Sequence, residues 1–398
     1  MMSVQRNQKF KPGLISKILI SIFIGVLCGL YMPEAFNRLL VTLSDLFAKY
    51  IGFIIPLMIL AFVTSGIADL PAGAGKLLAV TVGLAYCSTL VAGSSAYAVA
   101  VKLFPSFISA ADSAKIAAAA DKSLAPYIKI VLPAVFDTIS ALVLAFVLGL
   151  CLSATNAKER NSAIYRGMKE FTDFIIIVLK NTIIPLLPLY VCGVFTDLAR
   201  SGQVFAILSV LWKVFAVVIM LHLCCIALEF AIAGVFCGKS PLMLLMKQIP
   251  GYATALGTQS SAATIPVNLS CAESMGISAE IRNFTVPLCA TVHMCGSMIT
   301  ITCCAVAVLL MNSLTVSFGI IFPFMCTLAV AMVAAPGAPG GAIMTALPFL
   351  PMIGIAPTLQ ALMISLYIAQ DSFGTACNVS CDNALGLVVD KISGHSRQ

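Results

Sequence analysis

The sequence predicts an all-α polytopic membrane protein with eight transmembrane helices and two re-entrant helical hairpins. Of its 398 residues, 60% are hydrophobic and only 10% are charged, which leaves too little polar surface to cover a soluble fold of this size. The apolar runs are long and continuous rather than alternating, and this pattern favours helices over a β-barrel. Two further stretches in the C-terminal half are apolar at both ends and interrupted in the middle, which is typical of hairpins that enter a membrane without crossing it.

Six apolar segments before residue 238 are predicted to be simple spans. Each is long enough for the hydrocarbon core, which needs about 20 residues. Several exceed that length and should therefore tilt or break. In chain order they are Leu14–Tyr31, Leu46–Ile67, Leu77–Phe104, Ile128–Leu152, Phe171–Leu198 and Phe205–Phe236.

The positive charges of the connecting segments predict the orientation. The N-terminal tail, the segment Lys158–Lys169 and the C-terminal tail are rich in unopposed Lys and Arg residues. Such residues concentrate on the cytoplasmic side, so both termini should be cytoplasmic, in a bacterial inner (plasma) membrane. The formal charge of +7 is small for the length and does not suggest nucleic-acid binding. We expect no cleavable signal peptide, because the basic start leads directly into the first span.

After residue 238 the pattern changes to hairpin, helix, hairpin, helix. The first hairpin, Pro241–Ile277, contains the stretch Gly257–Pro266, and the second, Ile320–Ile353, contains Ala335–Gly341. Both stretches are rich in small and helix-breaking residues. Interrupted segments in matching positions are the best sequence indication of a transporter's binding site. The long apolar segments that follow the two hairpins are Phe284–Met311 and Pro357–Val389.

The last of these segments carries four polar residues at helical spacing. Asp371, Thr375, Asn378 and Asp382 follow one another at steps of four, three and four, which places them on one face of a helix. Carboxylates at membrane depth without a neighbouring Lys or Arg are costly and usually serve a cation, a substrate or a proton path. We interpret this face as the wall of a transport site. Asp382 with Asn378 and nearby carbonyls would bind sodium, and Asp371 would bind an ammonium group.

The two hairpin tips offer different chemistry. Hydroxyls and helix-end N–H groups in the first tip suit an anion such as an α-carboxylate, although small residues also allow close helix packing without any ligand. Gly and Pro residues in the second tip leave carbonyls unpaired, and carbonyls are good ligands for sodium. A kinked span has the same composition, so the residues alone leave these alternatives open.

Other polar and reactive residues within the apolar segments carry weaker signals. His293 is either a hydrogen-bonded structural residue or a titrating group, and the structural role is favoured. The 15 cysteines mostly lie in apolar segments without a metal-ligand pattern, so they are interpreted as small buried hydrophobes. His222 and Glu229, within or near spans, are assigned no role. Ser94 and Ser95 could face the site or bond their own backbone.

With these residues, the C-terminal half resembles the dicarboxylate/amino acid:cation symporter family, which includes the glutamate and aspartate transporters. The resemblance covers residues from about 240 to 392 well, and the six preceding spans fit in number and order. Within the family, the chain looks most similar to the sodium:serine/threonine symporter branch. The stretches Ser260–Asn268, Ile299–Thr302 and Gln370–Ser372 carry that similarity.

The resemblance implies site residues, motif by motif. The family's serine-rich hairpin tip matches Ser260 and Ser261, its Asn-Met-Asp-Gly-Thr motif matches residues 293–297, and its last-helix motif matches residues 371–382. Ser261 would take the substrate carboxylate. The implied substrate-binding residues are Ser260, Ser261, Met294, Ser297, Gly337, Asp371, Gly374, Thr375 and Asn378. The implied ligands of two sodium ions, several through backbone carbonyls, are Cys289, Thr291, His293, Met294, Met332, Val333, Ala335, Asn378 and Asp382.

Three departures from the family pattern narrow the expected substrate and ions. Gly374 replaces the arginine that acidic-substrate members use for the side-chain carboxylate, and Gln259 replaces an arginine that some members carry on the first hairpin. An acidic substrate side chain would then be a costly unpaired charge, so we expect a small neutral amino acid such as serine, threonine or alanine. His293 and Cys295 replace the asparagine and aspartate of the Asn-Met-Asp-Gly-Thr motif, so a third sodium site is expected to be lost or altered.

The resemblance further implies a homotrimer that works by alternating access. A static scaffold would comprise residues 1–76 and 125–203, and a moving transport unit would comprise residues 77–124 and 204–398. Other carriers remain open: one in which His293 and Asp371 carry protons, and one for a larger apolar or non-amino-acid solute. An ion channel is a further alternative. An enzyme is not expected, because no nucleophile–base pair or metal-ligand cluster is evident in the sequence.

Overall fold

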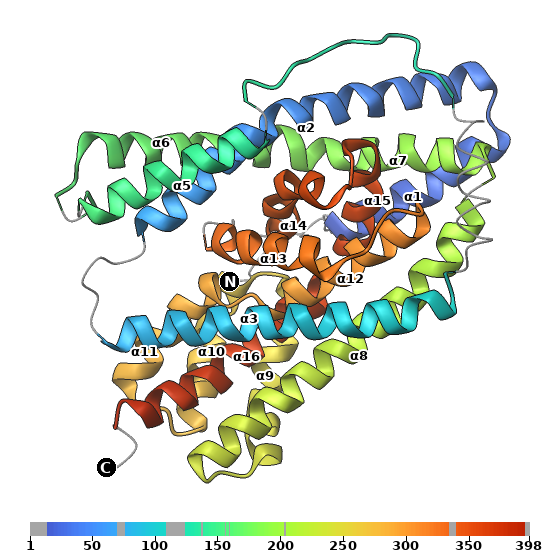
Figure 1. The fold of residues 1–398 in the computed structure, drawn as a ribbon. Helices are drawn as coiled ribbons and strands as arrows, with labels where there is room; N and C mark the ends of the chain where they lie inside the picture. The colour runs from blue at the N-terminus through green and yellow to red at the C-terminus, as the bar shows by residue number, and fades with distance from the viewer. Residues whose placement is uncertain are drawn as a thin grey trace, which may run out of the picture.

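The computed structural model describes residues 14–69, 76–108, 124–136, 138–155, 157–158, 160–202, 204–333 and 340–394 (Figure 1). Within these ranges the chain is predominantly helical and has no β-strand, which confirms the predicted all-α class. Among the described residues, five helical segments are long and apolar enough to cross a membrane, and shorter apolar helices accompany them. The five are Glu34–Ser65, Leu77–Ser106, Ala163–Arg200, Ile207–Cys237 and Ala279–Met311.

The helices before residue 238 cover the predicted spans, with one exception, but α2 begins at Glu34 and α6 at Ala163, well before the predicted starts at Leu46 and Phe171. A π-helical turn, Leu179–Ile183, joins α6 and α7 into one continuous helical segment. The other elements are α1 (Leu14–Tyr31), α2 (Glu34–Asp69), α3 (Lys76–Leu103), the 3-10 turn η1 (Phe104–Ser106), α5 (Thr138–Ala154), α6 (Ala163–Val178), α7 (Ile184–Arg200) and α8 (Val204–Cys237).

The exception is the predicted span Ile128–Leu152, which is wrong in its first part. Residues 124–136 form no regular secondary structure, and α5 begins only after residue 137. Pro133 lacks a backbone N–H and disfavours helix in the residue before it. Contacts with α2 take the place of helix bonds: Arg38 Nε donates to the Ala125 carbonyl at 2.8 Å, and its guanidinium lies 4.4 Å from the Tyr127 ring centre.

After residue 238, both long predicted segments are interrupted helices. The first breaks at His293–Met294, between α11 and α12, and the second breaks at Ala369–Gln370, between α15 and α16. The elements are α9 (Pro241–Thr258), α10 (Ser261–Ser274), α11 (Ala279–Val292), α12 (Cys295–Met311), α13 (Phe318–Met332), α14 (Gly341–Ala346), the 3-10 helix η3 (Leu347–Ile353), α15 (Pro357–Ile368) and α16 (Asp371–Ile392).

The helices form two sides with a buried middle. In Figure 1, α2, α5, α6 and α7 lie along one side, α3, α8, α9, α10, α11 and α16 along the other, and α12 to α15 between them. In the most apolar window of Ala279–Met311, 94% of the residues are buried, against 28% in that of α8. Trp212 and Val235 of α8 are 63% and 81% exposed. Such outward apolar side chains suit a lipid environment, whereas α12 lies inside the protein.

Helices α9 and α10 form a hairpin that three buried amides attach to α16. Asn268 Nδ2 donates to the Val379 carbonyl at 3.0 Å. Asn383 Nδ2 donates to Gln248 Oε1 and to Asn268 Oδ1, each at 2.8 Å. At the tip, Gln259 has a left-handed backbone with φ of 55°. This network fixes the hairpin beside the polar face of α16, because buried amides are costly to leave without partners.

Candidate functional site

Asp371 begins α16 immediately after the break between α15 and α16. Its side chain is buried, and its Oδ2 accepts a hydrogen bond of 2.6 Å from the backbone N–H of Gly340. Among the described residues, no Lys or Arg forms an ion pair with it. The carboxylate therefore faces the start of α14, at the edge of the second predicted hairpin tip. Two predicted ligands, Ala335 and Gly337, lie outside the described residues.

Asn378 joins α16 to the first turn of α12. Its Oδ1 accepts from the backbone N–H groups of Gly296 at 2.8 Å and Ser297 at 3.2 Å, and its Nδ2 donates to Ser297 Oγ at 3.0 Å and lies 3.4 Å from Met294 Sδ. The first N–H groups of a helix have no partner within it, so Asn378 acts as a cap supplied by another helix. Tyr367 donates to the same Ser297 hydroxyl at 3.2 Å.

A close approach of two backbones makes this arrangement possible. A Cβ atom at Gly296 would lie 2.4 Å from the Gly374 carbonyl oxygen and 2.6 Å from Cys377 Cβ. Only glycine lets α12 and α16 meet at this distance. The structure therefore brings four of the predicted substrate-binding residues together: Met294, Ser297, Gly374 and Asn378.

Asp382 lies beside His293, at the end of α11 in the break between α11 and α12. Its Oδ1 lies 3.1 Å from His293 Nδ1, and His293 Nε2 lies 2.8 Å from Ser88 Oγ. Ser88 in turn donates to Glu229, whose Oε1 is 3.8 Å from His293 Nε2. Three helices and the break in α11–α12 thus contribute to one polar chain, in which Asp382 and His293 are buried and Ser88 and Glu229 are half-buried, with His293 between two carboxyl groups. From the sequence, His293 and Asp371 are considered together as proton carriers, and in the structure the carboxyl group in direct contact with His293 is that of Asp382.

The remaining predicted residues take more varied positions. Ser261 and Thr375 are buried, while Ser260 Oγ accepts from Ala263 N–H and caps α10. Thr291 is exposed and donates to the Leu288 carbonyl of its own helix. Cys289 accepts the N–H of His293 at the end of α11, Met332 is buried, and Val333 ends α13. Thr291, a predicted sodium ligand, is therefore exposed, whereas the predicted ligands on α16 are buried.

Several polar residues of the site received no role from the sequence. His222 Nε2 lies 3.0 Å from both the Gly296 carbonyl and Thr300 Oγ1, and Met294 N–H donates to Thr89 Oγ1 at 3.3 Å. Ser88 and Glu229 likewise join the His293 chain. The ionisable residues could have been found, because such a residue within a membrane helix is a functional candidate by default. Ser88 and Thr89 gave no such signal.

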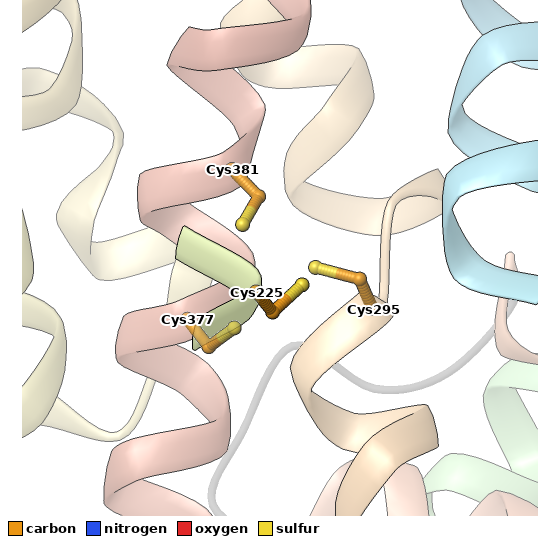
Figure 2. Close-up of side chains that lie close together, drawn as sticks. All are labelled: Cys225, Cys295, Cys377 and Cys381. Carbon is orange, nitrogen blue, oxygen red and sulfur yellow. The ribbon is translucent and has the colours of Figure 1, made fainter. Parts of the chain in front are cut away.

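Sulfur atoms also gather at this point of the fold. The Sγ atoms of Cys225 in α8, Cys295 in α12, and Cys377 and Cys381 in α16 all lie within 4.8 Å of one another (Figure 2). The sequence predicts that the cysteines are small buried hydrophobes and does not indicate that these four lie together, three of them buried and Cys225 half-buried. Their spacing along the chain contains no ligand motif, because three separate helices supply them.

The Asp382 carboxylate is a group that can bind a hard cation such as sodium. It is buried beside the end of α11, where the Cys289 carbonyl accepts the N–H of His293. The chemistry of the site thus combines a buried carboxylate near each helix break, hydroxyl and amide groups between them, and a neighbouring sulfur cluster.

Comparisons with known proteins agree with this architecture. The sequence model of the sodium:dicarboxylate symporter family matches residues 14–392. The serine/threonine transporter SstT of Streptococcus thermophilus (strain CNRZ 1066) is 26% identical over 96% of both chains. The protein of the same name from Streptococcus agalactiae serotype III (strain NEM316) is 27% identical over 96% of both chains. That from Acinetobacter baumannii (strain ATCC 17978) is 26% identical over 95% of this chain and 96% of its own. The chain is thus a multi-pass membrane protein that belongs to the sodium:dicarboxylate symporter family.

Proposed function

We propose that the protein is a secondary active transporter that couples sodium entry to the uptake of a small neutral amino acid of the serine, threonine or alanine type. The buried carboxylate of Asp371, at a helix break and without a Lys or Arg partner among the described residues, carries this proposal. A carboxylate in such a position stabilises a positively charged guest, here the substrate's ammonium group. Membership of the sodium:dicarboxylate symporter family supports sodium-coupled transport, and relatives that are named serine/threonine transporters support the neutral substrate class.

In this proposal, the eight spans are α1, α2, α3, α5, α6–α7, α8, α11–α12 and α15–α16, and the re-entrant hairpins are α9–α10 and α13–η3. The chain forms a homotrimer in a bacterial inner membrane, with both termini in the cytoplasm. Residues 1–76 and 125–203 form the scaffold, while residues 77–124 and 204–398 move as the transport unit. Alternating access follows when sodium and substrate together favour the closed, movable state of the second hairpin.

The substrate would lie between the first hairpin and α16. Ser261 and the first N–H groups of α10 take its carboxylate, because a helix N-terminus favours an anion. Asp371 takes the ammonium group, which then competes with the Gly340 N–H for the carboxylate and links substrate arrival to the second hairpin. Thr375 and Asn378 supply further polar groups. Gly374 offers no charge to an acidic side chain, so serine is preferred over aspartate.

Sodium would occupy two sites beside the substrate. Asp382 and the carbonyls of Cys289, His293 and Asn378 form one site in this proposal. Met294, Thr291 and the carbonyls of Met332, Val333 and Ala335 form the other. Sodium would then tie the break in α11–α12 to α16, so the ion completes the surface that meets the substrate.

Uptake of labelled serine into proteoliposomes tests this function. We expect uptake that requires an inward sodium gradient and is suppressed by unlabelled threonine or alanine but not by aspartate. Asp371→Asn should weaken serine binding by more than about 100-fold, because removing one partner of a buried ionic contact typically costs about 3–5 kcal/mol.

Asp390→Asn provides a matched control for this experiment. Asp390 is a second buried carboxylate of α16, but it accepts a hydrogen bond of 2.6 Å from Ser278 Oγ at the start of α11, away from the proposed site. Its variant should retain sodium-driven uptake. The proposal would be contradicted if serine uptake were unchanged after sodium is removed, or if the Asp371→Asn protein transported serine normally.

A second candidate, proton coupling, is favoured by the chain of Asp382, His293, Ser88 and Glu229. A histidine between two carboxyl groups can hold and pass a proton without leaving a buried charge unpaired. Uptake driven by an imposed pH gradient in sodium-free buffer would support this candidate, and His293→Asn should then abolish it. Failure of the pH gradient to drive any uptake in the unmodified protein would exclude it.

A further inference from the structure

We propose that Cys225, Cys295, Cys377 and Cys381 form a tetrahedral sulfur site for a thiophilic divalent ion of the zinc group. This site is distinct from the proposed sodium and substrate sites, and it does not depend on the proposed function. It joins α8, α12 and α16, which are the helices that surround the break in α11–α12 (Figure 2).

The positions of the four sulfur atoms fit this geometry. All four lie within 4.8 Å of one another. A tetrahedral zinc site with Zn–S bonds of about 2.3 Å places its sulfur atoms about 3.8 Å apart. The cluster therefore needs a contraction of at most about 1 Å, which side-chain rotation can supply. Cys377 and Cys381 are one helical turn apart in α16, so they present both sulfur atoms to the same side.

The donor set selects the class of ion. Sulfur donors favour zinc-type and other thiophilic ions, whereas sodium prefers oxygen. Burial of cysteines in α12 does not by itself bring their sulfur atoms together. Cys303 and Cys304 of the same helix are buried but do not belong to the cluster. These two cysteines show how a small apolar residue packs in this helix when it has no such neighbours.

The surroundings provide a neighbouring histidine and a route. Glu229, His293 and Cys295 also bring their donor atoms within 4.8 Å of one another, so an imidazole lies beside the sulfur site. The two ring nitrogens of His293 face Asp382 and Ser88, so this histidine is a neighbour of the four sulfur atoms and not a fifth ligand. A groove of about 380 Å³ between α3 and α8 is lined by Cys225, Ser88 and Glu229 and reaches the cluster from outside. Binding exchanges thiol protons for the metal ion, and this groove gives both a path.

Occupancy of the site should affect the neighbouring site on α16. Cys295 precedes Gly296, whose N–H donates to Asn378, and Cys377 precedes Asn378 itself. A metal ion that draws the four sulfur atoms together therefore shifts both partners of this hydrogen bond. It also fixes α8, α12 and α16 relative to one another.

Titration of the purified full-length protein with Cd²⁺ under reducing conditions tests the site directly. We expect a thiolate-to-metal charge-transfer band that saturates at one equivalent per chain. X-ray absorption of the Zn²⁺-loaded protein should give about four sulfur neighbours at about 2.3 Å. These readouts need no transport, so a failure here and a failure of the proposed function are distinguishable.

Variants separate this site from adventitious binding. Cys225→Ser and Cys381→Ser should each weaken Cd²⁺ binding by more than about 100-fold, since even residues that only orient metal ligands contribute about 10–100-fold. The double variant Cys303→Ala, Cys304→Ala is the matched control and should bind as the unmodified protein does. Gel filtration and thermal unfolding establish that each variant folds. If the variants of the cluster do not fold, the stoichiometry and the sulfur coordination of the unmodified protein decide the matter.

Three outcomes would overturn the proposal. The first is the absence of a charge-transfer band in the fully reduced protein. The second is a band that persists in folded Cys225→Ser or Cys381→Ser protein, or disappears in the control. The third is zinc coordination dominated by oxygen or nitrogen rather than sulfur.

Discussion

Two helix interfaces in this molecule are built by different means. Where α1 and α2 meet α7, glycines bring backbones into direct contact. A Cβ atom at Gly29 would lie 2.4 Å from the Thr196 carbonyl oxygen, and one at Gly193 would lie 2.5 Å from the Leu40 carbonyl oxygen. Small residues at helix interfaces in membranes give close van der Waals contact without a ligand or a polar bond.

Where α12 meets α16, close approach is combined with exchangeable polar bonds. Gly296 again allows the backbones to meet, but Asn378 then binds the free N–H groups at the start of α12. Nearby on α16, Asp371 accepts the backbone N–H of Gly340 at the start of α14, and Asp382 faces His293. Each of these groups could exchange its protein partner for an ion or a substrate atom.

The contrast between these two interfaces indicates which substitutions should affect ligand binding and which should affect only stability. The interface of α1 and α2 with α7 has an ion pair of 2.8 Å between Arg200 and Glu34 at its end, but its close approach rests on glycines. Substitutions at these glycines should therefore change stability alone. The interface of α12 with α16 consists largely of bonds to helix ends, so substitutions there should change ligand binding first.

The largest effect is expected for Asp382→Asn. Removing this carboxylate should raise the sodium concentration for half-maximal serine uptake by more than about 100-fold, because a buried cation loses its charged partner. Uptake measured over a sodium series gives this value. Asp390→Asn is again the control. An unchanged sodium dependence in Asp382→Asn would show that Asp382 does not bind the sodium ion.

An intermediate effect is expected for Gly29→Ala. The added methyl group overlaps the Thr196 carbonyl oxygen, so the free energy of unfolding should fall by about 1–3 kcal/mol. Gly52→Ala in α2 meets no atom within 4 Å and should be neutral or stabilising by up to about 1 kcal/mol, since alanine favours helix.

Chemical unfolding in detergent compares these two variants. Sodium dependence per folded molecule should be the same in both. A Gly29→Ala protein with normal stability but altered sodium dependence would reverse the proposed division between the two interfaces.

The smallest effect is expected for Tyr127→Leu. This change removes the ring that stacks on the Arg38 guanidinium, which should cost less than about 1 kcal/mol at an exposed position. Uptake should be unchanged, since the segment lies against α2. A loss of uptake without a loss of stability would show that residues 124–136 take part in transport.

Local patterns predicted much of the fold but not its tertiary contacts. The spans α1, α3 and α8 follow their apolar runs to within a few residues, because each run is long and contains no proline that would interrupt a helix. The predicted span at Ile128 failed because Pro133 and the contacts with α2 outweigh an apolar run. The orientation, the trimer and the division into scaffold and transport unit stay predictions.

The spacing of neighbouring residues was enough to predict the membrane class, the two interrupted stretches after residue 238 and the polar helix face from Asp371 to Asp382. The break between α15 and α16, the place of His293 between Asp382 and Ser88, and the meeting of four cysteines from three helices became visible only in the folded chain. Ser88 and His293 are 205 residues apart in the chain. Such partners depend on how each helix is rotated and packed against the others, and a local pattern carries no information about that rotation.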